Sequence, residues 1–301
     1  MKRKGFTLVE LLVVIAIIAL LMGILMPALS RVRQLAFRLT CGTNLSGVGK
    51  AMMIYANDYE DELPKAGGRN SAWGGVADWK AANRNLAFNL QADGSGGKAN
   101  INSCFYLLVK YAEVTPKSFV CKGDSGTSEF KLSDVTATLP SGFELIDAWD
   151  FGVSGVTGSE SWKHCSYSYH MPFGSNYALT VSSEPGFAVA SERNPWLASP
   201  AGDASQFNLF TPDLAGMGGN TESAKAGNAL AHQQEGQNVM FLDTHVEFEK
   251  RAYCSVEDDN IYTVGTTTGG AEKGNMPTLT SVPLSRKDTL LMLDPEKWGG
   301  R

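Results

Sequence analysis

The chain has 301 residues, of which 43% are hydrophobic, 19% are charged and 32 are glycine. At roughly 150 residues per domain, this length allows one large domain or two small ones. The 10% of aromatic residues excludes a chain that is disordered throughout, and a mean hydropathy of −0.12 excludes a membrane protein with many spans. A net charge of −5 disfavours binding to a phosphate backbone, so we expect no nucleic-acid partner.

The hydrophobic residues are concentrated at the N-terminus. Lys2-Arg3-Lys4 precedes an uncharged apolar run over residues 11–29, whose length matches the hydrocarbon core of a bilayer of about 30 Å. We expect a membrane helix over residues 6–29, with the basic cluster on the cytoplasmic side. The alternative is an ordinary secretory signal that is cleaved after Ser30.

Glu10 lies at the start of this apolar stretch. A carboxylate in a membrane segment costs a few kcal/mol on insertion scales, and such residues usually have a defined partner. Glu10 can simply reach the membrane surface, or it can pair with a cation at the same depth in another copy of the chain. An α-amino group produced by cleavage after Gly5 would supply that cation.

The N-terminal residues Gly5-Phe6-Thr7-Leu8-Val9-Glu10, preceded by a short basic leader, resemble the signal of type IV pilins and type II secretion pseudopilins. The resemblance implies that residues 1–5 are a leader, that a prepilin peptidase cuts between Gly5 and Phe6, and that the new terminal Phe6 is methylated. It also implies that Glu10 neutralises the terminal amine of a neighbouring subunit during filament assembly. Pro27 stands where mature pilins of this family carry a helix-kinking proline, consistent with the hydrogen bond that proline removes.

The same resemblance implies the partners and the location of the protein. The partners are the prepilin peptidase, other pilin or pseudopilin subunits in a homo- or hetero-filament, and the inner membrane. The protein would be a single-pass inner-membrane protein with its head in the periplasm, and would later join a filament or reach the cell surface. Secretion pseudopilus, surface pilus and DNA-uptake fibre remain open, as does a major or minor subunit.

Residues 30–63 are expected to continue the membrane helix as an amphipathic segment. Apolar residues recur every three or four positions, as on one face of a helix. They are Leu45, Val48, Met52, Tyr55 and Tyr59, and Leu35 and Leu39 extend this stripe towards the N-terminus. Pro64 and Gly67-Gly68 are expected to end the helix, and residues 64–301 would then form the globular head.

The head is predicted to be α+β, with the long helix packed on a small antiparallel sheet that has large loops. A short helix is expected over residues 105–111. Strands are expected over 118–121, 166–169, 177–181 and 187–190, followed by a hairpin with strands at 239–242 and 245–249 around Asp243-Thr244. In the second hairpin strand, apolar and polar residues alternate, which predicts one solvated face.

Residues 232–246 resemble the C-terminal H-x9-DG element found in many of these pilin-like proteins, in a degenerate form. Ten residues instead of nine separate His232 from Asp243, and Thr244 occupies the position of the usual glycine, which leaves the turn type open. His232, Asp243 and His245 can converge to bind a metal or a polar ligand, or they can be solvent-facing turn residues.

The five cysteines lie at positions 41, 104, 121, 165 and 254, without a C-x-x-C pair that would indicate a zinc ribbon. In an oxidising envelope they can form disulfides or remain buried thiols. Cys41 and Cys121 both lie in segments similar to landmarks of the pilin-like family, which favours this pair. Asp258-Asp259-Asn260 offers oxygen ligands but lacks the glycine and the terminal glutamate of a calcium loop. We therefore predict no metal and no cofactor.

No G-x-S-x-G, H-E-x-x-H or Walker pattern occurs, so we expect no enzymatic activity and predict a structural filament subunit. The alternative is a membrane-anchored envelope binding protein or hydrolase that uses the N-terminal segment only as an anchor. Tryptophans in loop-like segments would support glycan binding by such a protein. They are Trp73, Trp79, Trp149, Trp162 and Trp196.

Overall fold

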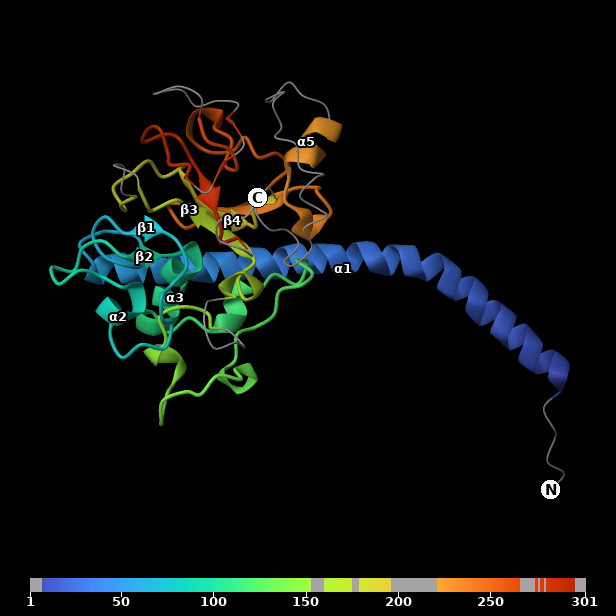
Figure 1. The fold of residues 1–301 in the computed structure, drawn as a ribbon. Helices are drawn as coiled ribbons and strands as arrows, with labels where there is room; N and C mark the ends of the chain where they lie inside the picture. The colour runs from blue at the N-terminus through green and yellow to red at the C-terminus, as the bar shows by residue number, and fades with distance from the viewer. Residues whose placement is uncertain are drawn as a thin grey trace.

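The computed structural model describes residues 7–152, 160–174, 179–195, 221–265, 274–275, 277–278 and 280–295. One helix, α1 (Leu8–Asp58), runs through the base of a loop-rich head and projects far beyond it on its N-terminal side (Figure 1). The membrane segment and the amphipathic segment expected from the sequence are therefore one continuous helix.

Local features of the chain explain where α1 begins and ends. Thr7 is the N-cap, and its hydroxyl oxygen accepts a hydrogen bond from the backbone N–H of Glu10. Pro27 lies inside the helix, and the projecting half of α1 bends (Figure 1), as expected where a proline removes a backbone hydrogen bond. The helix ends earlier than predicted, because Glu60 and Asp61 adopt positive φ angles of 54° and 61° before Pro64 is reached.

The C-terminal third of α1 packs against the head. Leu45, Val48 and Met52 are at most 1% exposed and Tyr55 is 7% exposed, so the predicted apolar stripe is buried from Leu45 to Tyr55, whereas Tyr59, its last member, is 38% exposed. The predicted extension of the stripe towards the N-terminus is wrong, because that part of the helix is not buried in the head. Leu35 and Leu39 are more than half exposed, because no part of the described head reaches that face.

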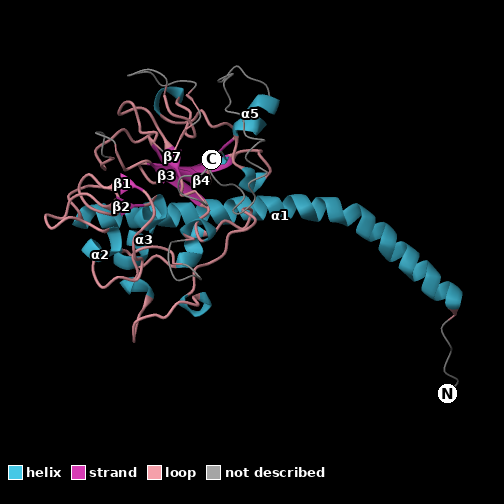
Figure 2. Ribbon diagram, viewed as in Figure 1, coloured by secondary structure: helices cyan, strands magenta, loops and turns pink. Residues whose placement is uncertain are grey.

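The main sheet has five strands, all antiparallel, in the order β6-β5-β4-β3-β7. These strands are β3 (Tyr167–His170), β4 (Ala188–Glu192), β5 (Gln237–Phe241), β6 (Val246–Glu249) and β7 (Leu291–Met292). Figure 2 labels three of these strands, β3, β4 and β7, which are drawn in magenta. The long helix and the small antiparallel sheet with its large loops confirm the α+β, pilin-like fold expected from the sequence. The predicted strands at 166–169 and 187–190 correspond to β3 and β4.

Two predicted strands are not found as such. Residues 118–121 overlap a 3-10 helix, η1 (Pro116–Phe119), because Pro116 sets a helical φ at its first position and Phe119 turns into the core. Of residues 177–181, the first two lie outside the described residues, and Thr180 forms only an isolated bridge with Glu62.

The predicted hairpin is formed by β5 and β6, with Val239 opposite Glu247 and Met240 opposite Val246. Its connection is longer than the two residues expected. The Phe241 N–H donates to the His245 carbonyl at 3.0 Å and the Thr244 N–H donates to the Phe241 carbonyl at 2.9 Å. Thr244 has a φ of 71°, which completes a three-residue loop that ends in a left-handed residue.

The remaining described elements are short and are joined by loops. They are β1 (Ala72–Trp73), α2 (Arg84–Phe88), β2 (Lys98–Ala99), α3 (Ile101–Tyr111), η2 (Leu132–Asp134), η3 (Leu145–Asp147), η4 (Ser161–Lys163), α5 (Thr221–Gly227), η7 (Leu230–His232) and η8 (Val256–Asp258). The helix predicted over 105–111 is α3, which begins earlier because Asn100 caps it.

The N-terminus of α3 is held by a carboxylate from the far end of the chain. The Asp294 oxygens accept hydrogen bonds from the backbone N–H groups of Ile101 at 2.8 Å and Asn102 at 2.7 Å, and from the indole of Trp73 at 2.9 Å. A negative charge at a helix N-terminus is stabilised by the helix dipole and by its unpaired N–H groups. This contact ties the segment after β7 to the first half of the head.

Both faces of the sheet are covered. The larger core joins α1, α3 and the aromatic loops, with Phe105, Phe119 and Phe151 fully buried. A second, smaller core on Val239, Ile261 and Tyr262 covers other residues of the sheet. Strands β4 and β5 are accordingly buried at every position.

Helix α1 approaches β5 very closely at Gly49. A Cβ atom built at this position would lie 2.4 Å from the Met240 sulfur, whereas a Cβ at Gly47 would meet nothing within 4 Å. Two glycines that the sequence marks only as weak helix formers therefore have different roles. Gly49 allows the contact between helix and sheet, and Gly47 is on the exposed side.

We predict that Gly49→Ala lowers the free energy of unfolding by about 1–2 kcal/mol, because overpacking against Met240 exceeds the gain in helix propensity. The matched variant Gly47→Ala should raise it by up to about 1 kcal/mol. Denaturant unfolding of the full chain in detergent, followed by circular dichroism, measures both. Equal effects of the two variants would contradict the close approach at Gly49.

Asp259 is a buried residue just before Ile261 and Tyr262, which belong to the second, smaller core. Its Oδ2 accepts a hydrogen bond from the backbone N–H of Thr289, but burial raises the pKa of this carboxyl from 3.8 to about 8. Between about pH 4 and pH 8 the folded chain therefore keeps a proton that the unfolded chain releases. The contribution of Asp259 to stability is then greatest at low pH and is lost as the pH rises through about 8.

We predict that Asp259→Asn has little effect on the melting temperature at pH 4 and raises it at pH 9, by on the order of 5 °C relative to the unmodified chain. The amide stays neutral and can still accept the bond from Thr289. Thermal unfolding across this pH range is the measurement. The exposed neighbour Asp258 is the control, since Asp258→Asn should show no such trend. A pH-independent difference for Asp259→Asn would contradict the prediction.

Candidate functional site

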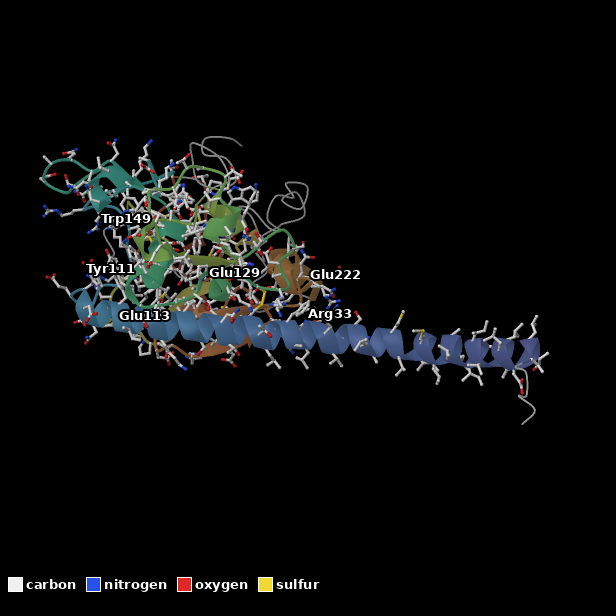
Figure 3. The ribbon with its side chains drawn as sticks, turned by 90° about the horizontal axis from the view of Figure 1, so that it is seen from below. Arg33, Tyr111, Glu113, Glu129, Trp149 and Glu222 are labelled. Carbon is white, nitrogen blue, oxygen red and sulfur yellow. A yellow bond between two sulfur atoms is a disulfide. The ribbon has the colours of Figure 1, made fainter. Side chains whose placement is uncertain are left out.

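The projecting part of α1 has a continuous exposed apolar surface. Its large apolar side chains between residues 8 and 29 are exposed by 46% (Val14) to 77% (Leu8). Figure 3 shows them pointing away from the helix with no covering structure around them. Among the described residues, α1 is the one helix that is long and apolar enough to cross a membrane, and its most apolar window has none of its residues buried.

Glu10 is held at the tip of this helix by Thr7. Its Oε2 accepts hydrogen bonds from the Thr7 backbone N–H at 2.8 Å and from the Thr7 hydroxyl at 2.7 Å, which completes a capping box. The carboxylate therefore faces the N-terminal end of the helix. Gly5 and Phe6, the expected cleavage and methylation residues, lie outside the described residues.

A disulfide fixes α1 where it enters the head. Cys41 and Cys121, the pair favoured in the sequence, are bonded with their Cα atoms 5.2 Å apart, and both are fully buried. The side-chain amide of Asn44 also donates to the carbonyl of Val120, at 3.4 Å. Cys104, Cys165 and Cys254 are free thiols. The bridge links the first buried residue of α1 to the loop that follows η1.

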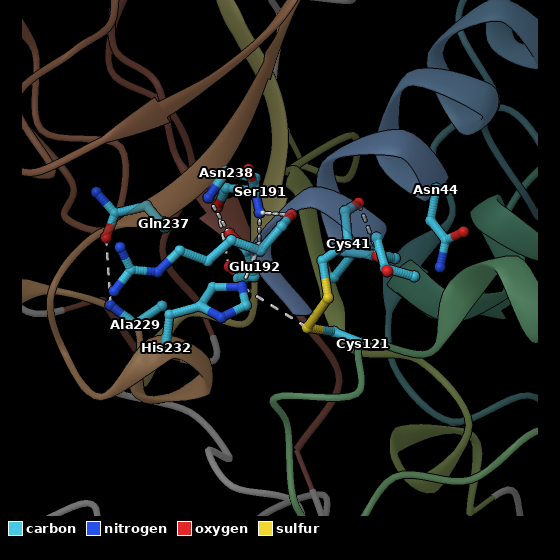
Figure 4. Close-up of polar contacts among 12 residues, drawn as sticks. Cys41, Asn44, Cys121, Ser191, Glu192, Ala229, His232, Gln237 and Asn238 are labelled. Atoms are coloured by element: carbon cyan, nitrogen blue, oxygen red, sulfur yellow. Dashed lines mark hydrogen bonds and ion pairs between the residues drawn. A yellow bond between two sulfur atoms is a disulfide. The ribbon is translucent and has the colours of Figure 1, made fainter. Parts of the chain in front are cut away.

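A buried polar network adjoins this disulfide (Figure 4). His232 Nε2 lies 3.0 Å from Glu192 Oε1 and 3.8 Å from Cys121 Sγ, and the His232 side chain is only 2% exposed. The Asn238 side chain donates to Glu192 Oε1 at 2.6 Å, and the Asn238 backbone N–H donates to Oε2. A carboxylate at the end of β4 is thus fixed by three donors from the C-terminal half of the head.

Arg193, the residue after Glu192, forms a buried ion pair with Asp124. Arg193 Nε is 3.0 Å from Asp124 Oδ2, and both side chains are fully buried. Arg193 also donates to the carbonyl oxygens of Trp162, at 2.8 Å, and Cys165. This pair positions the loop that carries Cys121. Buried pairs of this kind are stable only when such additional hydrogen bonds are present.

Sequence reasoning missed Glu192, Arg193, Asp124, Asn238 and Asp294. The available signal was the sequence Ser191-Glu192-Arg193-Asn194, which places two charged residues directly after an apolar strand. Their partners lie far away in the sequence, so only the tertiary structure identifies them.

The three residues of the C-terminal element do not form one site. His232 belongs to the buried network, whereas the side chains of Asp243 and His245 are about half exposed and contact each other at the hairpin turn. The hydrogen bond from His245 lowers the pKa of Asp243, and the His245 ring stacks on Phe241 with a centroid distance of 4.4 Å. Asp243 and His245 are therefore turn residues, and His232 is an interior one.

Asp259 and Asn260 use their side-chain oxygens in hydrogen bonds within the head. Asp259 accepts from Thr289, as described, and Asn260 Oδ1 accepts from the Tyr262 N–H at 3.0 Å. In contrast, Cys41, Cys121, Glu192 and His232 bring sulfur, oxygen and nitrogen atoms within 4.8 Å of one another. Within the described ranges, this is the cluster whose atoms could hold a metal ion.

Comparison with curated proteins and with solved structures found no match to this chain. Residues 1–26 match the family model of the prokaryotic N-terminal methylation motif. The match includes Gly5, Phe6 and Glu10 and extends over most of the exposed apolar part of α1. The chain therefore carries the N-terminal signal of a type IV pilin-like precursor.

Proposed function

We propose that this protein is a structural subunit, a pilin or pseudopilin, of a type II secretion or type IV pilus-like filament. The observation that carries the proposal is the combination of the methylation motif with an uncovered apolar helix on one chain. A prepilin peptidase would remove residues 1–5 and methylate Phe6. The precursor would lie in the inner membrane with its head in the periplasm.

The exposed face of α1 supports assembly through this helix. An apolar surface that is exposed continuously from Leu8 to Leu29 is not stable in water, so lipid or other helices must cover it. In the membrane the lipid tails cover it. In a filament the same helices of neighbouring subunits would pack against one another and replace the lipid.

Glu10 would set the register between subunits. Among the described residues, the bonding partner of its carboxylate is Thr7, at the start of its own helix. These local bonds reduce the cost of keeping the carboxylate in an apolar environment before assembly. The Phe6 amine of a neighbouring subunit would then provide the opposite charge.

The proposal assigns the head no catalytic reaction and no cofactor. The glycan-binding alternative rests on tryptophans in loop-like segments. Trp79, Trp149 and Trp162 are at most 8% exposed and serve as core residues, and Trp73 donates to Asp294. Trp196 lies outside the described residues.

Mass spectrometry of the mature N-terminus tests the processing step. We expect a chain that begins at Phe6 and carries one additional methyl group, which changes the net side-chain charge from −5 to −8 because Lys2, Arg3 and Lys4 are lost. Gly5→Glu should leave the full precursor. A mature chain that begins at Met1, or after Ser30, would contradict the proposal.

A set of variants at the helix tip tests the assembly step. Glu10→Ala should be processed normally but should fail to enter filaments, with at least about a tenfold loss, the equivalent of 1.4 kcal/mol per contact. Glu10→Gln separates charge from capping, because the amide still accepts from Thr7 but cannot pair with an amine. We expect it to fail as well.

Thr7→Val is the matched control. It removes the hydroxyl of the capping box and leaves the charge of Glu10, so it should still assemble. Fractionation of sheared filaments, with quantification of the incorporated subunit, measures all three variants. Assembly of Glu10→Gln at the normal level would assign Glu10 a capping role instead.

A further inference from the structure

The four side chains around the disulfide come from four separate elements. Cys41 is in α1, Cys121 follows η1, Glu192 ends β4 and His232 ends η7. All four are buried, and their sulfur, oxygen and nitrogen atoms lie within 4.8 Å of one another (Figure 4). Each of the four residues offers one ligand atom to a metal ion.

The donor set selects the metal. Two sulfurs, one imidazole nitrogen and one carboxylate oxygen match the ligands that Zn²⁺ takes in tetrahedral protein sites. Calcium and magnesium take oxygen ligands and would not use the cysteines. We propose that, when the Cys41–Cys121 disulfide is reduced, Cys41, Cys121, Glu192 and His232 bind one Zn²⁺ ion. This proposal is independent of the filament function.

The change from the disulfide form to the zinc-bound form balances in electrons, protons and charge. A dithiol donates two electrons and two protons to the Cys41–Cys121 bond, forms its own disulfide and leaves two protein thiols. Zn²⁺ then displaces the two thiol protons and binds both thiolates. The two positive charges of the metal offset the two new thiolate charges. The net charge of the buried cluster is therefore the same as in the disulfide form with a neutral His232.

The surrounding contacts already orient the ligands. Asn238 holds both oxygens of Glu192. His232 Nε2 is the ring atom that points at Glu192, 3.0 Å from its Oε1. Zinc would take Nε2 as its ligand, and the proton of the neutral ring would then lie on Nδ1. Outer contacts of this kind fix ligand orientation in metal sites.

The movement required is small. Two sulfurs bound to one zinc at about 2.3 Å in a tetrahedral site lie roughly 3.7 Å apart, so the bonded pair must separate by less than 2 Å. Either state keeps the entry point of α1 joined to the loop after η1. The zinc form would thus maintain the same connection in the presence of a dithiol.

The test uses the full-length chain in detergent. The chain is reduced with dithiothreitol, which is then removed under anaerobic conditions, and Co²⁺ and Zn²⁺ are titrated. We expect one ion per chain, tetrahedral visible bands and a thiolate-to-cobalt band in the near ultraviolet, and displacement of Co²⁺ by Zn²⁺. The oxidised chain should bind neither ion.

Variants assign the ligands. Glu192→Gln and His232→Gln should weaken binding by at least about tenfold. Cys254→Ser and His245→Ala should not, because these residues lie outside the cluster. Cys165→Ser is a second thiol control, since burial raises the pKa of that thiol to about 12 and keeps it protonated.

Three results would overturn the proposal. One is a reduced chain that remains folded by circular dichroism but binds no stoichiometric Zn²⁺. Another is metal binding that the control variants abolish and the ligand variants do not. If the reduced chain unfolds without metal, added Zn²⁺ must restore its helical signal, and failure to do so would equally refute the site.

Discussion

The contact between α1 and β5 is the one on which the rest of the head depends. The helix can approach the strand closely because Gly49 has no side chain where Met240 lies. Leu45, Val48 and Met52 then become core residues, and the sheet gains a cover on this face. The same helix must remain uncovered further towards its N-terminus. One helix therefore has an exposed apolar part and a part packed in the head, and burial in the head begins at Cys41.

Buried carboxylates fix the positions of distant segments in this loop-rich head. Regular strands are short here, and three of them, β1, β2 and β7, have only two residues. Asp294 and Glu192 compensate by accepting backbone N–H groups from distant segments. Burial raises the pKa of Asp294 to about 6, because the ionised carboxylate is less well solvated inside the head than in water. The ionised form is nevertheless the better hydrogen-bond acceptor. Such groups fix loop positions that apolar packing alone would leave free to slide.

The sequence predicts those features that depend on local pattern. The apolar run, the stripe at 45–55, the β5–β6 hairpin and the N-terminal signal all follow from periodicity or from a contiguous motif. The strand predicted at 118–121 is wrong because Pro116 and the need to bury Phe119 favour a 3-10 turn. The pairing of β7 with β3 joins residues more than a hundred positions apart, and no local pattern encodes it. The Glu192–His232 contact was missed for the same reason, although His232 itself was singled out from the motif.

The position of the Cys41–Cys121 bridge determines how the molecule carries load. Residues 30–40 separate the apolar run from the bridge by about 16 Å of helix, which is a rigid spacer. Tension applied along α1 from its N-terminal end reaches Cys41 before it reaches the packed stripe at 45–55. The covalent link divides this force between the helix and the loop after η1. The noncovalent packing beyond the bridge therefore bears less of the applied force. The covalent link at Cys41 opposes separation of the head from α1 on the side nearest the membrane segment.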